Sequence, residues 1–460
     1  MSDKRQKNQL QMLLAFTREG RSEAPKARGE GTESLTAKRA CKSAVIPEPV
    51  MEEVCERKNL LRALRRVKSN RGSPGIDGMK VGELPGYLKQ HWPRIREPWL
   101  SGTYEPQPVR RVEIPKPDGG VRQLGIPTVL DRFIQQAVMQ VLQGQWDRTF
   151  SEHSHGFRPG RSAHQAVAKA QQYVRPGRRW VVELDLEKFF DRVNHDRLMK
   201  SVSLRIADQR MLRLIGAFLK AGVMENGLVS PVDEGTPQGG PLSPLLSHLV
   251  LDELDRELER RGHRLVRYAD DCNIYVRSGA AGRRVMDSVT RFITRRLKLK
   301  VNQSKSAVAR PAERKFLGFS IGSGREAKRR IAPQALARCK RKIRELTRRT
   351  RGISMKQRVT DLAAYLRGWK SYFGFCETPS VLKALDQWIR RRLRSVIWRQ
   401  WRHSRVRFRH LREQGVGQGL TAQTVGSRHS CWRLALSPAL QLALSPAYFD
   451  ALGLPRLFHG

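Results

Sequence analysis

Apolar residues recur along the chain at two spacings, and each spacing predicts a different kind of element. Spacing of three or four residues, which is typical of helices, occupies three stretches: 51–67, 130–142 and 245–258. Short apolar or alternating runs, which are typical of strands, occur at 109–114, 121–126 and 180–184, and twice within 264–276. Because strands and helices alternate through residues 104–320, the pattern predicts an α+β domain there.

Beyond residue 325 the pattern becomes entirely helical. One apolar stripe with helical spacing consists of Leu382, Leu385, Ile389, Leu393, Val396 and Ile397. Arginines at positions 390, 391 and 394 lie off this stripe, so we expect an amphipathic, basic helix. Residues 18–46 have few large apolar residues, and their composition favours a flexible linker behind a short helix at 10–17.

Charge narrows the class of partner. The chain has 460 residues and a formal net charge of +45, from 88 Lys and Arg against 43 Asp and Glu. Such an excess opposes compact folding unless an anionic partner neutralises it, and nucleic acid is the partner that suits a folded protein of this charge. About half of the excess lies in residues 325–412, which hold 27 Lys and Arg against five Asp and Glu.

A membrane partner is the weaker alternative. The sequence contains no apolar run of about 18 residues and no helix suited to a membrane surface, so we expect no membrane association. The six cysteines include no Cys-x-x-Cys pair and no His at zinc spacing, so we also expect no zinc. Reduced thiols and the lack of a signal-peptide layout at the N-terminus predict a cytoplasmic protein.

Two acidic centres carry the candidate chemistry. Asp270 and Asp271 follow Tyr268-Ala269 at the junction of two apolar strands, and Asp185 ends another apolar strand. Adjacent carboxylates repel each other unless a cation lies near them, and carboxylate oxygens suit Mg²⁺. The three together can hold two Mg²⁺ ions, the arrangement that supports phosphoryl transfer. The plain alternatives are a solvent-exposed Asp-Asp turn and, for Asp185, a helix cap.

A loop rich in Gly and Pro, Gly-Thr-Pro-Gln-Gly-Gly-Pro-Leu-Ser-Pro at 235–244, precedes the helix predicted at 245–258. So many helix-breaking residues indicate that another group approaches the backbone closely. The loop is therefore either a platform for a nucleobase or sugar, or a structural hinge.

The order of these motifs resembles that in the reverse transcriptases encoded by bacterial group II introns, which also serve as splicing maturases. The resemblance covers residues 56–410. It rests on the following segments in order: Gly-Ser-Pro-Gly-Ile-Asp-Gly (72–78), Ile-Pro-Lys-Pro (114–117), Gly-Phe-Arg-Pro-Gly-Arg-Ser-Ala-His (156–164), the Asp185 strand, the Gln238 loop, Tyr-Ala-Asp-Asp (268–271), Asn-Gln-Ser-Lys-Ser (302–306) and Phe-Leu-Gly-Phe (316–319).

The resemblance implies an α+β fold of the right-hand polymerase type. Its fingers, palm with an antiparallel sheet, and helical thumb are followed by an all-α maturase domain. The implied domains are an N-terminal helix and linker (1–50), fingers and palm (51–320), a basic helical thumb and maturase RNA-binding domain (321–412), and a C-terminal extension (413–460).

The resemblance also implies roles for single residues around the nucleotide. Asp185, Asp270 and Asp271 would be the metal ligands, with the backbone carbonyl of Leu186 as a further contributor. The remaining nucleotide contacts fall to four residues: Lys116 and Arg122 would grip the triphosphate, Phe190 would exclude ribonucleotides at the sugar, and Gln238 would contact nucleotide or template. The compact ammonium charge of a lysine and the forked guanidinium of an arginine both suit phosphate oxygens.

Further implied roles concern catalysis and the nucleic-acid strands. Lys305 is a candidate general acid for the departing pyrophosphate. Arg158 and Arg161 would bind template or nucleotide, while Phe316 and Gly318 would support the primer end. Trp388, Trp398 and Trp401 have near-helical spacing, and we expect them to be core residues rather than base-stacking ones.

The function implied is RNA-directed DNA polymerisation with two Mg²⁺ ions, together with assistance to splicing. Expected partners are group II intron RNA, an RNA template, a DNA primer or target, and deoxynucleoside triphosphates, in a bacterial cytoplasm and at the nucleoid during action on DNA. The last fifty residues contain no paired cysteines or His-Asn-His signature, so we expect no endonuclease activity. The alternatives are a free-standing reverse transcriptase used in DNA repair or phage defence, and a non-enzymatic RNA-binding splicing factor.

Overall fold

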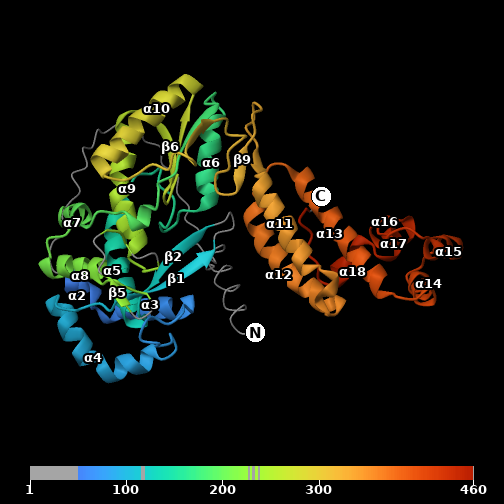
Figure 1. Cartoon of the computed structure of the whole chain (residues 1–460), viewed down its shortest axis with the longest axis horizontal. Coiled ribbons are helices and arrows are strands. Elements are labelled where there is room, and N and C mark those ends of the chain that lie inside the picture. Colours follow the sequence, from blue (N-terminus) through green and yellow to red (C-terminus); the bar gives the residue numbers. More distant parts are fainter. Residues whose placement is uncertain (1–49, 116–119, 226–227, 231–233, 237–238, 459–460) are drawn as a thin grey trace, which may run out of the picture. The chain divides into compact units, whose positions relative to one another are not determined.

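The computed structural model describes residues 50–115, 120–225, 228–230, 234–236 and 239–458. The described residues form two compact units (Figure 1): an N-terminal unit of residues 50–317 and 321–327, and a C-terminal unit of residues 318–320 and 328–458. The helix predicted at 10–17 and the linker predicted at 18–46 lie outside the described residues.

The N-terminal unit mixes helices and strands, which confirms the α+β prediction. Its helices are α2 (Val50–Val54), α3 (Arg57–Asn70), α4 (Leu84–Ser101), α5 (Val129–Trp146), α6 (Ala163–Val174), α7 (His195–Ser203), α8 (Gln209–Lys220), α9 (Ser243–Arg260) and α10 (Gly279–Phe292). Its strands are β1 (Val109–Pro115), β2 (Val121–Ile126), β3 (Trp180–Leu184), β4 (Val223–Glu225), β5 (Leu228–Ser230), β6 (Arg264–Tyr268), β7 (Asp271–Val276) and β8 (Ala307–Ala309).

One four-stranded sheet lies at the centre of the N-terminal unit. Its order is β6-β7-β3-β8, and every neighbouring pair is antiparallel. Helices α6 and α9 pack along β6, and α10 packs along β3 and β8 (Figure 1). Val182, Leu184, Leu265 and Ile274 on these strands are buried in the core, which explains the short apolar runs that predicted the strands.

A second sheet has the order β2-β1-β4-β5. The hairpin predicted from the sequence forms its first half, since β1 and β2 pair in antiparallel fashion with Ile114 opposite Arg122. β4 adds to β1 in parallel and pairs with β5 in antiparallel fashion. This sheet carries the basic residue Arg122 on an exposed strand.

Helix boundaries follow from local side-chain bonds. The helix predicted at 51–67 is in fact two helices, α2 and α3, and Asn59 Nδ2 donates to the carbonyl of Val54 at the end of α2 and to that of Ala137 on α5. The helices predicted at 130–142 and 245–258 are confirmed as α5 and α9. Capping by Thr128 at α5 and by Asp208 at α8 fixes two of the helix starts.

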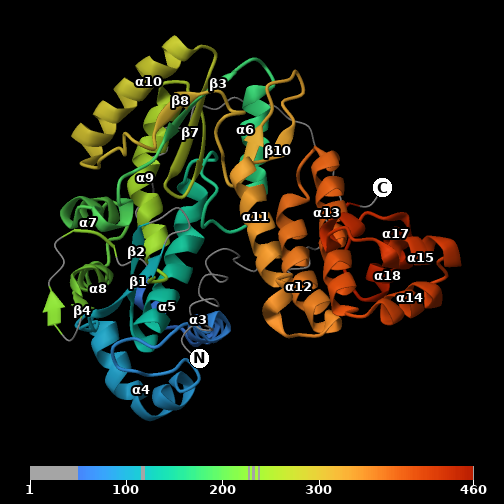
Figure 2. The same ribbon diagram turned by 45° about the vertical axis from the view of Figure 1, so that its right-hand side comes forward.

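The C-terminal unit is helical apart from β10 (Arg329–Ile331) and the first two residues of β9 (Phe319–Ile321), and these two strands pair with each other. Its helices are α11 (Pro333–Leu346), α12 (Met355–Phe373), α13 (Pro379–Gln400), α14 (Ser404–Glu413), α15 (Gln418–Gly426), α16 (Cys431–Leu434), α17 (Pro438–Ala443) and α18 (Pro446–Ala451). Figure 2 shows α14, α15, α17 and α18 gathered beside α13. Among the described residues, no helix combines the length and the apolar character that a membrane span requires.

The apolar stripe predicted on α13 is buried, but its arginines are not all solvent-facing. Arg390 and Arg394 are 9% and 7% exposed. The segment after residue 413 contributes to the burial of Arg394, whose Nε donates to the Leu444 carbonyl at 2.9 Å. Asp386 similarly accepts from the backbone nitrogens of Leu457 and Phe458. The C-terminal extension is thus part of the folded unit.

Candidate active site

The turn between β6 and β7 presents two adjacent carboxylates. Tyr268 pairs with Asp271 across the hairpin, which leaves Ala269 and Asp270 as the two turn residues. Ala269 has a φ of 56°, a conformation that costs an ordinary L-residue roughly 1–2 kcal/mol. The turn therefore needs support from the surrounding structure.

A buried ion pair supplies part of this support. The side chains of Arg267, on β6, and Asp255, on α9, are 1% and 0% exposed. Arg267 Nε donates to the two carboxylate oxygens of Asp255 at 2.8 and 3.0 Å. Its Nη1 donates to the carbonyl of Ala269 at 2.8 Å. The guanidinium thus connects the turn to the helix behind it.

Gly156 and His248 support the turn from another side. A Cβ added at Gly156 would lie 2.4 Å from the backbone nitrogen of Ala269, so the two backbones are in direct contact. His248 Nε2 bonds to the Gly156 carbonyl and must therefore carry the proton. Burial lowers the pKa of His248 to about 3, and the charge of Arg267 adds to this effect, so the ring is neutral. Its Nδ1 lies 3.4 Å from Ser154 Oγ.

Asp185 lies at the end of β3, next to the same turn. Leu184, the last residue of β3, pairs with Cys272, which directly follows Asp271 on β7. Ser306 Oγ accepts from the Asp185 backbone nitrogen at 3.0 Å, and the Asp185 carbonyl accepts from Asn302 at 2.8 Å. The sheet and the predicted motif at 302–306 therefore hold Asp185 from both sides.

Two further predicted residues lie beside Asp185. Lys305 Nζ is 3.9 Å from Asp185 Oδ2, and its side chain is 63% exposed. Leu186 is buried and forms an isolated β-bridge with Val301. Both residues therefore lie close to Asp185, and their roles at the site stay predictions.

The carboxyl groups influence one another electrostatically. Burial and then the charge of Asp185 raise the pKa of Asp270, while Arg122 and Arg267 oppose the rise. Burial, Asp270 and Asp185 raise the pKa of Asp271, which Lys315 opposes. Asp271 is classed as an exposed residue, yet burial of its carboxylate is the largest cause of the raised pKa. Negative charge is thus concentrated here, with Arg122 close enough to act on it.

The donor set suits a hard divalent cation. Three carboxylates from two neighbouring strand ends offer oxygen ligands, and a cation would relieve their repulsion. In the part of the chain that the structure describes, no three acidic, His or Cys side chains already converge as a ligand set.

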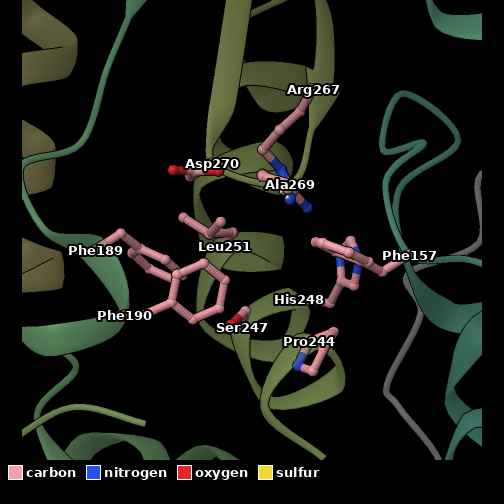
Figure 3. Close-up of a pocket in the computed structure, with 10 residues that line it drawn as sticks. All are labelled: Phe157, Phe189, Phe190, Pro244, Ser247, His248, Leu251, Arg267, Ala269 and Asp270. Atoms are coloured by element: carbon pink, nitrogen blue, oxygen red, sulfur yellow. Dashed lines mark hydrogen bonds between the residues drawn. The ribbon is translucent and has the colours of Figure 1, made fainter. Parts of the chain in front are cut away.

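A narrow pocket adjoins Asp270. Figure 3 shows Phe189 and Phe190 on one side of it and Phe157 and His248 on the other. The rest of the lining consists of Pro244, Ser247, Leu251, Arg267, Ala269 and Asp270. Phe189 is a core residue with 2% exposure, whereas Phe190 is only partly buried. Both rings line the pocket, and Phe190 is the more accessible of the two.

Arg158 is a structural residue, contrary to the predicted contact with template or nucleotide. It is 7% exposed. All five of its guanidinium N–H groups are used, in bonds to the Asp147 carboxylate and to the carbonyls of Asp147, Ser151 and Ser154. Arg161 differs, because it is partly exposed and one of its guanidinium nitrogens bonds to the Glu152 carbonyl.

The glycines of the predicted loop lie against other parts of the chain. A Cβ at Gly235 would be 2.8 Å from the Phe190 carbonyl oxygen. Added Cβ atoms at Gly239 and Gly240 would be 2.5 Å from the Gly125 carbonyl oxygen and 2.4 Å from Gln135 Oε1. These contacts favour the structural interpretation of the glycines.

Other predicted site residues differ in how they are placed. Lys116 and Gln238 lie outside the described residues. Phe316 is buried in the N-terminal unit, at 8% exposure. Gly318 belongs to the C-terminal unit, where a Cβ would lie 3.1 Å from the Phe373 ring. The structure therefore gives Gly318 a packing role.

Three supporting residues were missed by sequence reasoning: Asp255, His248 and Phe157. A signal existed for Asp255, because an acid between Leu254 and Leu258 lies on the apolar face of its helix. The partners of His248 and Phe157 come from distant segments, so no local pattern could reveal them.

Comparisons with known proteins agree with the motifs. Residues 114–321 match the family described as "Reverse transcriptase (RNA-dependent DNA polymerase)". Residues 336–415 match "Group II intron, maturase-specific domain". The first match contains every carboxylate of the site, and the second lies within the helical C-terminal unit.

Individual relatives point the same way. Protein YkfC of Escherichia coli K12 is 42% identical over 44% of this chain and 55% of its own length. Group II intron-encoded protein LtrA of Lactococcus lactis is 31% identical over 56% of this chain and 54% of its own. The chain thus spans about half the length of these curated relatives. A solved Cas6-RT-Cas1–Cas2 complex matches at 23% identity over 54% of this chain and 43% of its own, with a TM-score of 0.35.

The two domains occur in the order that the motifs predicted, one on each compact unit. The mixed α/β unit carries the acidic turn, and the helical unit carries the maturase-specific segment. The chain therefore belongs to the group II intron-encoded reverse transcriptase and maturase proteins.

Proposed function

We propose that the protein is an RNA-directed DNA polymerase and a maturase for group II intron RNA. The observation that supports the polymerase function is the position of Asp185 directly after β3, beside the turn that holds Asp270 and Asp271, where its charge raises the pKa of both. Two Mg²⁺ ions, held by these carboxylates and the Leu186 carbonyl, would stabilise negative charge at the reacting phosphate.

The chain's own residues would position the substrates. Arg122 lies within electrostatic reach of Asp270 and would bind the triphosphate, together with Lys116. Phe190 would pack against the sugar of the incoming nucleotide. The primer 3′-hydroxyl would form a bond to the α-phosphorus, and the bond to pyrophosphate would break. Lys305 would donate a proton to the departing pyrophosphate.

The maturase function would depend on the C-terminal unit. Three cations surround the partly exposed ring of Trp388: Lys340 at 5.9 Å, Arg344 at 5.5 Å and Arg392 at 5.3 Å from its centroid. Burial, Arg344 and Arg349 lower the pKa of Arg392. Like charges held this close favour an anionic partner, and RNA phosphates supply one. We call Lys340, Arg344, Trp388 and Arg392 the Trp388 cluster.

Acting on intron RNA and DNA would place the protein in the bacterial cytoplasm and at the nucleoid. Its substrates would be an RNA template, a DNA primer or target, and deoxynucleoside triphosphates. Each of these partners carries phosphates, which suits the net charge of +45.

Primer extension on an RNA template tests the polymerase function. The double variant Asp270→Ala with Asp271→Ala should abolish extension, while Asp287→Ala, which removes an exposed carboxylate from α10, should not. Extension by the double variant at the wild-type rate would refute the assignment.

Intron splicing, measured separately, tests the maturase function. The aspartate double variant should still assist splicing, because RNA binding would not need the acidic centre. The variant Arg344→Gln with Arg392→Gln should weaken intron binding. The number of phosphate contacts that follows from the salt dependence of the binding constant should fall by up to about two. The variant Arg283→Gln with Arg284→Gln removes the same charge from α10 and serves as the control. Equal losses in the two arginine variants would argue against a role specific to the Trp388 cluster.

A further inference from the structure

We propose that Phe157 contacts the template nucleotide at the catalytic centre and thereby positions the base pair that forms there. This inference rests on the proposed polymerase function. It gives a role to a residue for which the sequence motif suggested none.

The first observation is the exposure of the ring. Phe157 is 51% exposed, and it is the one aromatic residue among the large exposed apolar side chains of the described segments. A single exposed apolar residue is common on protein surfaces, so exposure alone does not indicate a function. The backbone conformation of Phe157 and its position beside Asp270 do indicate a function.

The second observation is a disfavoured backbone conformation that the structure holds firmly. Phe157 has a φ of 54°, which is unusual for a bulky residue. Its carbonyl accepts from Gln143 Nε2 at 3.1 Å. The residue before it, Gly156, is held by a hydrogen bond between its carbonyl and His248. The guanidinium of the residue after it, Arg158, is fully hydrogen-bonded. Strained residues held in place in this way are concentrated at functional sites.

The third observation is the direction in which the ring lies. Phe157 lines the pocket beside Asp270, on the wall opposite Phe190 (Figure 3). The preceding residue, Gly156, touches the backbone of Ala269 in the catalytic turn. If Phe190 borders the sugar of the incoming nucleotide, the opposite wall faces its partner in the pair, which is the template nucleotide. An aromatic ring can pack on any base or sugar, so the contact would not depend on the template sequence.

Two substitutions separate the ring from the strained backbone. Phe157→Gly removes the ring and tolerates the positive φ, so the variant should fold at least as stably as the wild type. Its KM for the incoming nucleotide on an RNA template should rise about tenfold, since a base–aromatic contact of ordinary strength is lost. Phe157→Tyr keeps the ring and should stay near the wild-type KM. Leu204→Ala, which shortens an exposed apolar side chain elsewhere, should change nothing.

Crosslinking tests the position directly. A 4-thiouridine at the templating position should crosslink to the peptide that contains Phe157 in the wild type, and the crosslink should be lost in Phe157→Gly. An unchanged KM in Phe157→Gly, or a crosslink from this position to other peptides alone, would overturn the inference while the wild-type enzyme still extends primers. A wild type that extends no primer would instead refute the polymerase function on which the inference rests.

Discussion

Arg267 joins the buried carboxylate of Asp255 to the carbonyl of Ala269, so one guanidinium links a core ion pair to the turn that presents Asp270 and Asp271. Ala269 cannot adopt its positive φ at no cost, and this bond opposes relaxation of the turn. The position of Asp270 and Asp271 thus depends on a charge pair in the core behind them.

Replacing Arg267 by Met should destabilise the N-terminal unit. The substitution leaves Asp255 charged and buried without a partner, and such losses are about 3–5 kcal/mol in the free energy of unfolding. Urea unfolding of the full chain, followed by a probe in the N-terminal unit, measures the change. Primer extension should fall as well, because the turn loses its bond to the carbonyl of Ala269.

The double variant Arg267→Met with Asp255→Leu separates stability from activity. Replacing both members of a buried pair by apolar residues is often neutral, so much of the stability should return. Polymerisation should stay low, since no donor reaches the Ala269 carbonyl. Wild-type activity in this double variant would show that the turn does not need Arg267.

Replacing Gly156 by Ala should displace the catalytic turn. The new Cβ would lie 2.4 Å from the Ala269 nitrogen, so one of the two backbones must move. We expect primer extension to fall by about two orders of magnitude, because displacements of about 1 Å at a reacting centre have effects of this size. Binding of intron RNA should be unchanged.

Gly144→Ala is the matched control. Gly144 lies exposed on α5, and a Cβ there meets no atom within 4 Å. Alanine should stabilise the helix slightly and leave polymerisation intact. If Gly156→Ala behaved in the same way, the contact between Gly156 and the turn would have no functional importance.

The sequence predicted those parts of the site that depend on local order. Asp185 was found because an apolar strand ends there, and Asp270 and Asp271 because two apolar strands flank them. The structure confirms these strands as β3, β6 and β7. Local pattern sufficed, because strand periodicity and turn position are properties of neighbouring residues.

The errors arose where the folded backbone around a side chain decides its environment. Arg158 was expected to face nucleic acid, but carbonyls from Asp147 to Ser154 and the Asp147 carboxylate surround its guanidinium. Arg394 was expected off the apolar stripe and is buried by the segment that contains Leu444. A basic residue looks the same in sequence whether its partner is a phosphate or a carbonyl of its own chain, so tertiary contacts were needed to distinguish the two.

The neutral His248 should make the protein less stable in mild acid. Its pKa in the folded protein is about 3, against 6.5 for the free side chain, because burial disfavours the charged ring. Between these two pKa values, the unfolded chain therefore carries a proton on this side chain that the folded chain does not bind. The free energy of unfolding should fall as the pH drops from 6.5 toward 3, by about 2 kcal/mol at pH 5 from this residue.

The variant His248→Gln isolates this effect. Glutamine can still donate to the Gly156 carbonyl but does not titrate, so its stability should depend less on pH between 6.5 and 5. The comparison also removes opposing contributions such as that of Asp131, whose pKa burial raises to about 6. Urea unfolding of both proteins at pH 7 and pH 5 measures the difference. Parallel losses in the two proteins would show that His248 is already protonated or solvated in the folded state.

Lys305 should accelerate departure of pyrophosphate. Its Nζ lies 3.9 Å from Asp185 Oδ2 on an exposed side chain, so it can reach both the acidic centre and a bound nucleotide. Lys305→Ala should reduce the maximal rate of primer extension by about 10²–10³-fold, within the range of general acid catalysis, with little change in KM. Lys300→Ala, which removes an exposed lysine from the preceding segment, serves as the control.

The leaving group distinguishes proton donation from simple positioning of Asp185. Nucleotide analogues whose β,γ-bridging oxygen is replaced by a difluoromethylene group release a more acidic bisphosphonate, which needs less help from a general acid. The defect of Lys305→Ala should therefore shrink with these analogues. If Lys305 only held Asp185 in place, the variant would be equally slow with both nucleotides, because the position of the carboxylate does not depend on the leaving group.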